Sequence, residues 1–284
     1  MKNLNRIIGS LILLTIFVTG CSFTQKEKTL TIPNNLKGNG LVVLCYHRVL
    51  PTWVLHWGKL FYPSESELSR YAISTKDFNK QLNYLKQQGV RFVTPQEAED
   101  FLNGRKLFSG KLVLITFDDG DLSVYKHAFP VLKEKHIPFM LFFIAGQAGK
   151  EWEGFNMCTW NQLKEMVGSG LCTVGLHTYD LHYFDSQTKK PVFLLPDKEK
   201  LFAADTEKGI NSFKKQLGIK VKYFAYPYGF GTPSTDRILI GHQIPYIFTL
   251  DSRVNHQGDP CFFIGRILVT PNSWQKVADW ARYR

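Results

Sequence analysis

Short apolar runs alternate with amphipathic stretches along most of the chain from residue 41 onward. A continuous apolar run of about four to eight residues is typical of a strand buried on both faces, whereas an apolar residue at every third or fourth position is typical of a helix. Strands are predicted at 41–46, 111–117, 139–144, 171–176, 223–226, 246–250 and 262–269. Helices are predicted at 75–88, 95–103, 122–135 with Pro130 as a kink or break, 159–167, 197–217, 236–241 and 272–282.

Strands that alternate with helices predict an α/β fold in which helices cover a parallel sheet. About seven strand–helix units fit a closed or nearly closed (β/α) barrel. An open doubly wound sheet is the alternative, but it usually carries a glycine-rich phosphate turn, and the sequence contains neither G-x-G-x-x-G nor a P-loop. We therefore expect one barrel domain over residues 41–284.

Composition and charge agree with a globular protein and limit its partners. The chain has 284 residues, of which 44% are hydrophobic and 21% charged, so one domain with a sizeable core is expected. The formal charge of +11 favours anionic surfaces such as a membrane or a cell-wall polymer. We do not expect nucleic acid as a partner, because the sequence has no Lys/Arg-rich run and no nucleic-acid module.

The first residues are typical of an export signal. Lys2 and Arg6 precede a short apolar stretch at 7–18, which ends at Thr19-Gly20-Cys21. Small residues before a cysteine resemble the bacterial lipobox, which implies cleavage before Cys21 and a lipid on it. On this interpretation residues 1–20 are a signal peptide, residues 21–40 a lipidated tether, and the protein sits on the extracellular face of the cell membrane. An ordinary signal peptide with a chance cysteine is the alternative.

The other cysteines do not suggest a cysteine metal site. Cys45 and Cys172 lie in apolar runs and are expected to be buried free thiols. Cys158 and Cys261 complete the set, and no pair has the C-x-x-C spacing of a zinc site. A disulfide in an exported protein stays open, because the sequence does not select partners.

Polar residues follow several of the predicted strands. His47, Asp118 with Asp119, His177 and Tyr228 each come just after a strand. Because the carboxyl ends of parallel barrel strands meet on one rim, these residues are candidates for one active site.

The paired carboxylates and histidines suggest a metal. Adjacent charges on Asp118 and Asp119 are costly at the end of a buried strand, and a cation would relieve one of them. Because successive side chains of a strand point to opposite sides, Asp118 and Asp119 are predicted to point in opposite directions. One carboxylate could then bind the cation while the other stays free as a base. His177 and His182 would lie about 140° apart on a helix, but on a loop they could join Asp119 around catalytic zinc or a similar divalent metal. The alternatives are a helix N-cap pair and two surface histidines.

Three motifs carry a family resemblance. Thr116-Phe-Asp-Asp-Gly120 is similar to the T-F-D-D-G motif of polysaccharide deacetylases (carbohydrate esterase family four), and His177-Thr178 and Ala225-Tyr-Pro-Tyr228 resemble the family's second and third motifs. The resemblance implies a distorted (β/α) barrel that removes acetyl groups from sugars with a bound metal. It also implies a role for each matching residue. Asp118 would be the general base, and the backbone N–H of Tyr228 would donate a hydrogen bond to the oxyanion. The metal ligands would be Asp119, His177 and His182.

Departures from the family pattern point to a subgroup. The histidine spacing is one residue longer than the usual H-x-x-x-H, Ala225 replaces an arginine, and Thr270 stands where a late histidine is usual. The same departures resemble the poly-β-1,6-N-acetylglucosamine deacetylases of biofilm formation, whose acid histidine comes from an early Tyr-His pair. This resemblance implies His47 as general acid. Arg266 is a candidate to replace the missing arginine and orient Asp118, against an ordinary structural ion pair.

An aromatic-rich segment at 53–62 has no clean helical or strand period, so a loop is predicted there. Exposed apolar rings mark interaction sites, and tryptophan and tyrosine favour membrane interfaces. Sugar stacking and a lid packed on the barrel are the alternatives.

The function predicted is a metal-dependent hydrolase that removes N-acetyl groups from extracellular poly-β-1,6-N-acetyl-D-glucosamine, a biofilm polysaccharide. Two other classes remain open, namely the same chemistry on peptidoglycan or chitin-like oligomers, and a non-catalytic glycan-binding lipoprotein. The intact set of candidate residues argues against the last, because a degenerate site loses its ligands.

Overall fold

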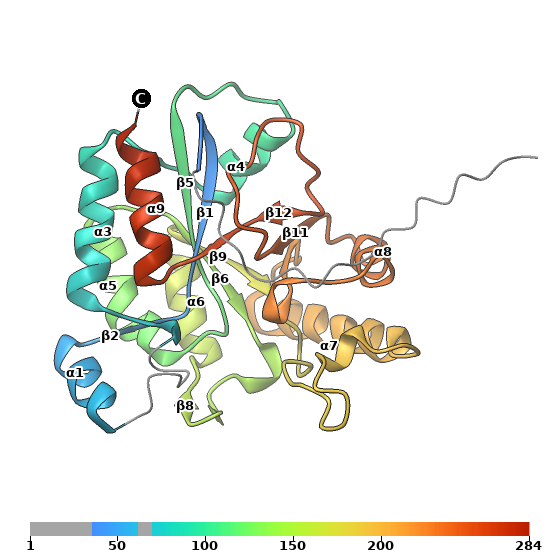
Figure 1. The fold of residues 1–284 in the computed structure, drawn as a ribbon. Coiled ribbons are helices and arrows are strands. Elements are labelled where there is room, and N and C mark those ends of the chain that lie inside the picture. Colours follow the sequence, from blue (N-terminus) through green and yellow to red (C-terminus); the bar gives the residue numbers. More distant parts are fainter. Residues whose placement is uncertain (1–35, 62–69, 284) are drawn as a thin grey trace, which may run out of the picture.

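A nearly closed barrel of parallel strands forms the centre of the protein, as a computed structural model that describes residues 36–61 and 70–283 shows (Figure 1). The strand order is β12-β11-β10-β9-β6-β5-β1-β13, and β4 adds to the sheet beside β5. The predicted barrel is confirmed, with eight strands along this path where about seven were expected. The predicted signal peptide and Cys21 lie outside the described residues.

Apart from β4, which was not predicted, the strands of the barrel sheet correspond to the apolar runs of the sequence. They are β1 Gly40–Tyr46, β4 Arg91–Phe92, β5 Lys111–Phe117, β6 Phe139–Phe143, β9 Cys172–Leu176, β10 Tyr223–Ala225, β11 Tyr246–Thr249, β12 Ile264–Gly265 and β13 Ile267–Leu268. Two small sheets lie outside the barrel, and they are formed by β2 Arg48–Leu50 with β3 Ala72–Ser74, and by β7 Glu151–Trp152 with β8 Phe155–Asn156.

Helices follow most of the barrel strands and cover their outer faces (Figure 1). The α-helices are α1 Thr52–Phe61, α3 Thr75–Gln87, α4 Pro95–Leu102, α5 Phe129–Glu134, α6 Trp160–Gly168, α7 Glu199–Leu217, α8 Pro233–Gly241 and α9 Pro271–Arg282. Shorter helical turns are η1 Val124–Ala128, η2 Ala145–Gln147, η3 Val192–Leu194 and η4 Pro227–Gly229. Capping boxes at Thr94 and Thr159 start α4 and α6, close to where these two helices were predicted to begin.

The barrel nearly closes at Arg266. The strands β12 and β13 end the strand order on opposite sides, yet Arg266 alone separates them along the chain. On one side Ile264 pairs with β11, and on the other Ile267 pairs with β1. The chain therefore crosses the gap in the barrel at Arg266, whose side chain is fully buried.

Strand alternation separates the barrel interior from its outer face. In β1, Leu41 and Val43 belong to one apolar cluster together with α4, whereas Val42 and Leu44 belong to the cluster beneath the outer helices. The polar candidate residues follow the last apolar residues of their strands. The candidate site therefore lies at the carboxyl ends of the strands.

The structure corrects the loop predicted at 53–62, because residues 52–61 form the helix α1 (Figure 1). Leu55 is buried, whereas Trp53 is 68% exposed. Within residues 52–56, one apolar side chain is buried and another is exposed, so this part of the helix has no continuous apolar stripe, which is why its period was not visible. None of the helices in the described part of the chain combines the length and the apolar character needed to cross a bilayer.

The helix predicted at 122–135 is present over residues 122–134 and is distorted in its first half. Residues 124–128 form a π-helical turn, and α5 begins at Phe129 with Pro130 in its first turn. The helical backbone continues without interruption from residue 122 to 134, and the wider π turn lies just before Pro130, whose ring cannot donate a backbone hydrogen bond. The predicted kink or break at Pro130 is therefore a π-helical distortion within one continuous helix.

Candidate active site

The polar residues predicted to share one rim do converge. A cavity of about 50 Å³ opens at the carboxyl ends of the barrel strands. Its lining consists of His47, Tyr71, Asp118, Asp119, Trp152, His177, His182, Tyr228 and Leu250. The residues come from seven separated parts of the sequence, so chain neighbours alone do not create the cavity.

Asp119, His177 and His182 form a group that suits a divalent metal. The Oδ1 atom of Asp119 lies 3.5 Å from Nε2 of His182 and 3.7 Å from Nε2 of His177. Ligands about 2.0–2.1 Å from a tetrahedral zinc ion would be separated by roughly 3.3 Å, so small movements suffice to bind one. One carboxylate and two imidazoles are also the donor types that catalytic zinc takes. The residues present therefore fit the metal.

Each histidine of this group is held by a different part of the fold. The Nδ1 atom of His177 lies 2.7 Å from the carbonyl oxygen of Ala225, which directs Nε2 into the cavity. Burial lowers the pKa of His177 to about 3, so the imidazole is neutral, as a metal ligand must be. The ring of His182 lies against Trp152, at 5.0 Å, and Tyr228, at 4.8 Å between ring centroids.

A tight loop brings His182 back to His177, as predicted. The Asp205 carboxylate accepts hydrogen bonds from the backbone N–H groups of Tyr179, at 2.7 Å, and Asp180, at 2.8 Å. Thr178 adopts a positive φ of 70°. Helix α7 therefore fixes the loop that carries the second imidazole, because Asp205 is part of this helix.

The turn after β5 directs both carboxylates into the same cavity. Asp119 has a φ of 67° and Gly120 a φ of 96°, so the strand has already ended. A Cβ atom on Gly120 would lie 2.1 Å from Cδ2 of Phe143, so this position requires glycine. The prediction that strand alternation separates Asp118 from Asp119 is wrong, because the left-handed turn replaces the alternation.

Asp118 is paired with Arg266. Its Oδ1 and Oδ2 atoms accept hydrogen bonds from the guanidinium at 2.6 Å and 2.8 Å, and both side chains are buried. Burial acts to raise the pKa of Asp118, but the positive charge of Arg266 outweighs it, and the pKa falls well below its usual value. Asp118 is therefore an ionised carboxylate with a fixed orientation.

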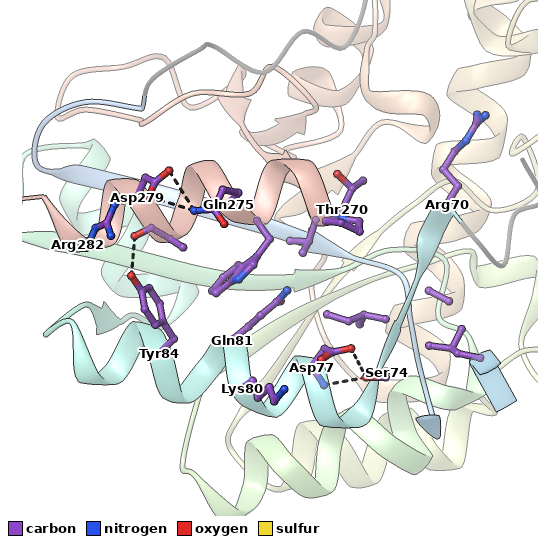
Figure 2. Close-up of a pocket in the computed structure, with 17 residues that line it drawn as sticks. Arg70, Ser74, Asp77, Lys80, Gln81, Tyr84, Thr270, Gln275, Asp279 and Arg282 are labelled. Carbon is purple, nitrogen blue, oxygen red and sulfur yellow. Dashed lines mark hydrogen bonds and ion pairs between the residues drawn. The ribbon is translucent and has the colours of Figure 1, made fainter. Parts of the chain in front are cut away.

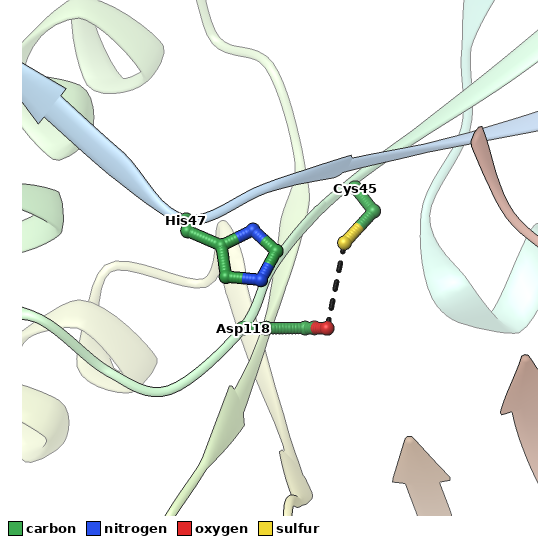
Figure 3. Close-up of side chains that lie close together, drawn as sticks. All are labelled: Cys45, His47 and Asp118. Atoms are coloured by element: carbon green, nitrogen blue, oxygen red, sulfur yellow. Dashed lines mark hydrogen bonds between the residues drawn. The ribbon is translucent and has the colours of Figure 1, made fainter. Parts of the chain in front are cut away.

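His47 and Cys45 flank Asp118 on the inner side of β1 (Figure 3). The Cys45 thiol donates a 3.4 Å hydrogen bond to Oδ2 of Asp118, and burial raises the pKa of this thiol. Burial also lowers the pKa of His47, against the opposing effect of the two carboxylates. The ring of Tyr71 lies 4.7 Å from the ring of His47.

Cys45, His47 and Asp118 are themselves close enough to hold a cation, since their ligand atoms lie within 4.8 Å of one another. Two features make them the poorer site. The Asp118 carboxylate already bonds the positive Arg266, and Cys45 is a protonated thiol. The group of Asp119, His177 and His182 is therefore the better candidate metal centre. The cysteines at 45, 158, 172 and 261 are all free thiols.

Tyr228 lies beside His182 in a strained backbone conformation. Its φ is 60°, and the following Gly229 has a carbonyl that accepts a 2.8 Å hydrogen bond from the N–H of Leu250. The Tyr228 ring packs on Phe184 at 4.1 Å. A residue other than glycine in this conformation often marks a functional site.

A larger cavity of about 600 Å³ lies between α3 and α9 (Figure 2). Its walls include Tyr84, which donates a hydrogen bond to the carbonyl of Ala278, and the ion-forming Asp77 and Arg282. Neither of the two metal-suited groups among the described residues touches it. The smaller cavity therefore holds the candidate chemistry.

Comparison with known proteins identifies the family. The family model described as polysaccharide deacetylase matches residues 105–247. A poly-β-1,6-N-acetyl-D-glucosamine N-deacetylase of Staphylococcus aureus (strain N315) is 30% identical over 242 residues, which cover 85% of this chain and 82% of that protein. The chain belongs to the polysaccharide deacetylase family.

Solved structures agree with this assignment. The structure of IcaB from Ammonifex degensii is 62% identical to this polysaccharide deacetylase, with a TM-score of 0.80, and the match covers 88% of this chain and 100% of that one. A de-N-acetylase from Aggregatibacter actinomycetemcomitans, at 23% identity and a TM-score of 0.71, shares the fold over 84% of this chain and 100% of that one. The protein is thus an enzyme, a hydrolase that removes acetyl groups.

Sequence reasoning missed some residues of this deacetylase site. Tyr71, Trp152 and Leu250 line the cavity, and buried Arg48 lies beside Asp119. Arg48 directly follows His47, and this position next to a catalytic candidate could have indicated from the sequence that Arg48 belongs to the site. Trp152 lies in a short hairpin without a strand-like apolar run, so no pattern marked it.

Proposed function

We propose that this enzyme is a zinc-dependent N-deacetylase of poly-β-1,6-N-acetyl-D-glucosamine. The observation that carries the proposal is the placement of three groups around one cavity. These are the Asp119, His177 and His182 cluster, the Asp118–Arg266 pair and His47. Together they offer a metal site, an ionised base and a separate proton donor, which amide hydrolysis requires.

Asp119, His177 and His182 would hold the metal. A divalent zinc ion bound there supplies Lewis acidity, which polarises the acetyl carbonyl and makes water more acidic. The neutral state of His177 suits this role.

Asp118 acts as the general base in this proposal. It takes a proton from the attacking water while a C–O bond forms at the acetyl carbon. Arg266 keeps the carboxylate ionised and aimed, because it bonds both oxygens. The backbone N–H of Tyr228 would donate to the oxyanion, since Tyr228 lines the same cavity.

His47 acts as the general acid. It donates its proton to the amide nitrogen as the C–N bond breaks, so that acetate and a free amine leave. His47 lies close to Asp118 (Figure 3), and the ring of Tyr71 packs against the imidazole. The proton that Asp118 gains from water balances the one that His47 gives.

The substrate follows from the relatives rather than from the cavity alone. A staphylococcal relative is named a poly-β-1,6-N-acetyl-D-glucosamine N-deacetylase, and a second one, from Staphylococcus epidermidis (strain RP62A), is 29% identical over 244 residues. The closeness to IcaB supports the same substrate class. Free amines would make the product cationic and adhesive toward anionic surfaces.

Linkage preference tests this substrate. We expect acetate release from β-1,6-linked N-acetylglucosamine oligomers at least tenfold faster than from β-1,4-linked oligomers of equal length. Acetate is measured with and without added zinc, and the Asp118→Asn variant is the background control. Faster release from the β-1,4-linked oligomers, or from peptidoglycan, would replace the proposed substrate with that glycan.

We also propose that the protein is held at the extracellular face of the cell membrane by a lipid on Cys21, with α1 as a second contact. The formal charge of +9 that remains without Lys2 and Arg6 and the 68% exposed Trp53 support contact with an anionic bilayer. Cys21→Ser is expected to shift the protein from the membrane fraction to the medium. In that background, Trp53→Glu is expected to weaken sedimentation with anionic vesicles severalfold. A membrane-bound Cys21→Ser protein would exclude the lipid anchor, and unchanged sedimentation would exclude α1.

A further inference from the structure

Arg48 places a buried positive charge beside the candidate metal centre. The residue begins β2, directly after His47, and its side chain is fully buried. Its Cζ atom lies 3.8 Å from the centre of the Phe155 ring. A buried guanidinium is tolerated only where carboxylates compensate it, so its partners show what it does.

Two carboxylates compensate Arg48, and one of them is Asp119. The Nη2 atom of Arg48 lies 3.7 Å from Oδ2 of Asp119, and its Nε atom lies 3.7 Å from Oδ2 of Asp121. The other oxygen of Asp119, Oδ1, faces the Nε2 atoms of the two histidines. The two oxygens of Asp119 are therefore divided between the metal centre and the arginine.

Asp121 is oriented by its own turn. Its Oδ1 atom accepts a 2.8 Å hydrogen bond from the backbone N–H of Ser123, which leaves Oδ2 facing Arg48. The Ser123 hydroxyl in turn accepts a 3.1 Å bond from the N–H of Val49, next to Arg48 in β2. The arginine and the aspartate are thus fixed to each other through the backbone as well as through their charges.

The hairpin β7–β8 closes this arrangement from outside. A β-bridge joins Met157 to Asp121, and the N–H of Cys158 donates a 2.8 Å hydrogen bond to the carbonyl of Gly120. These bonds hold Phe155 over the guanidinium, while Trp152, its pairing partner in the hairpin, lies against His182. The Arg48 and Asp121 side chains are almost completely buried beneath the hairpin, and the exclusion of water strengthens their attraction.

We propose that the Arg48–Asp121 ion pair positions Asp119 as a ligand that offers one oxygen to the metal. This inference rests on the metal site of the proposed function. Arg48 lies beside Oδ2 of Asp119, so Oδ1 is the oxygen that would face a bound ion. Asp121 cancels the charge of Arg48, which would otherwise repel a divalent cation and compete with it for Asp119.

The test is the zinc affinity of the full-length protein, measured by competition with a chromophoric chelator. Asp121→Asn is the main variant, because asparagine keeps an oxygen for the Ser123 N–H but lacks the charge. We expect its zinc dissociation constant to rise at least tenfold, since an uncompensated Arg48 then draws Asp119 away from the ion. The double variant, Arg48→Met with Asp121→Asn, has the net charge of the wild type but lacks both charged side chains that are proposed to position Asp119. It is expected to bind zinc about ten- to a hundredfold more weakly.

The control is Arg91→Met with Glu97→Gln. This pair is also an arginine with a carboxylate and an aromatic ring, but Arg91 lies beside the amino end of β5, away from the cavity. Its zinc affinity should stay within twofold of the wild type. Thermal unfolding of each metal-free variant separates stability from binding.

Three results would overturn the inference. A folded Asp121→Asn protein with wild-type zinc affinity would do so by itself, even where the double variant fails to fold. A double variant that is less stable yet binds zinc normally would reduce Arg48 to a structural role. A wild-type protein that binds no zinc would overturn the proposed function as well. If the wild type binds zinc and the variants bind it equally well, only the inference is overturned.

Discussion

Replacing Asp118 with asparagine is expected to lower kcat about a thousandfold, because a positioned general base contributes roughly 10²- to 10⁴-fold to a rate. Asparagine has nearly the shape of aspartate and can still accept one hydrogen bond from Arg266, so the cavity should persist. Acetate release from β-1,6-linked oligomers measures the loss. Zinc binding should be retained, because Asp119, His177 and His182 are untouched.

Asp197→Asn is the matched control. Asp197 is exposed and has a φ of 63°, a conformation that asparagine adopts readily. Its activity should equal that of the wild type. If Asp118→Asn keeps more than a tenth of the wild-type kcat while folding normally, Asp118 is not the base.

Removal of the metal is expected to abolish activity, and added zinc should restore it, since the polarised carbonyl and the acidified water both depend on the ion. Extended dialysis against a chelator gives the metal-free protein. His182→Gln should reproduce this loss at ordinary zinc concentrations, because the ligand set falls from three residues to two. Zinc affinity and acetate release are both measured.

The comparison variant for the metal prediction is His256→Gln. His256 is exposed and does not line the cavity. It should keep wild-type zinc affinity and activity. Full acetate release by demonstrably zinc-free protein would exclude the metal mechanism, and normal zinc binding by His182→Gln would remove His182 from the ligand set.

The strands were predictable because burial on both faces leaves a direct trace in the sequence. The apolar runs at 41–46 and 111–117 became β1 and β5 within one residue, since an unbroken run fits the centre of a parallel barrel. Helix α1 left no such trace, because in its first turn the exposed Trp53 is as apolar as the buried Leu55. The strands β12 and β13 were predicted as one extended stretch, and the break at Arg266 depends on the closing of the barrel.

The candidate site was predictable as a set of residues but not as an arrangement. A barrel brings all carboxyl ends of its strands to one rim, so His47, Asp118 and His177 could be expected to meet. The direction of Asp119 was predicted wrongly, because a left-handed turn cannot be recognised from strand alternation. The position of Arg48 next to His47 was a signal, but its contacts were not predictable, because they depend on Phe155 and Asp121, which lie far along the chain.

The amino-acid sequence by itself determined the alternation of strands and helices and the chemical types of side chain that follow each strand, because both are local properties of the chain. Only the tertiary structure decided which atoms face one another. Arg266 reaches Asp118 across 148 residues, and each oxygen of Asp119 has its own neighbour, because closing the barrel sets these distances and excludes the water that would weaken the contacts.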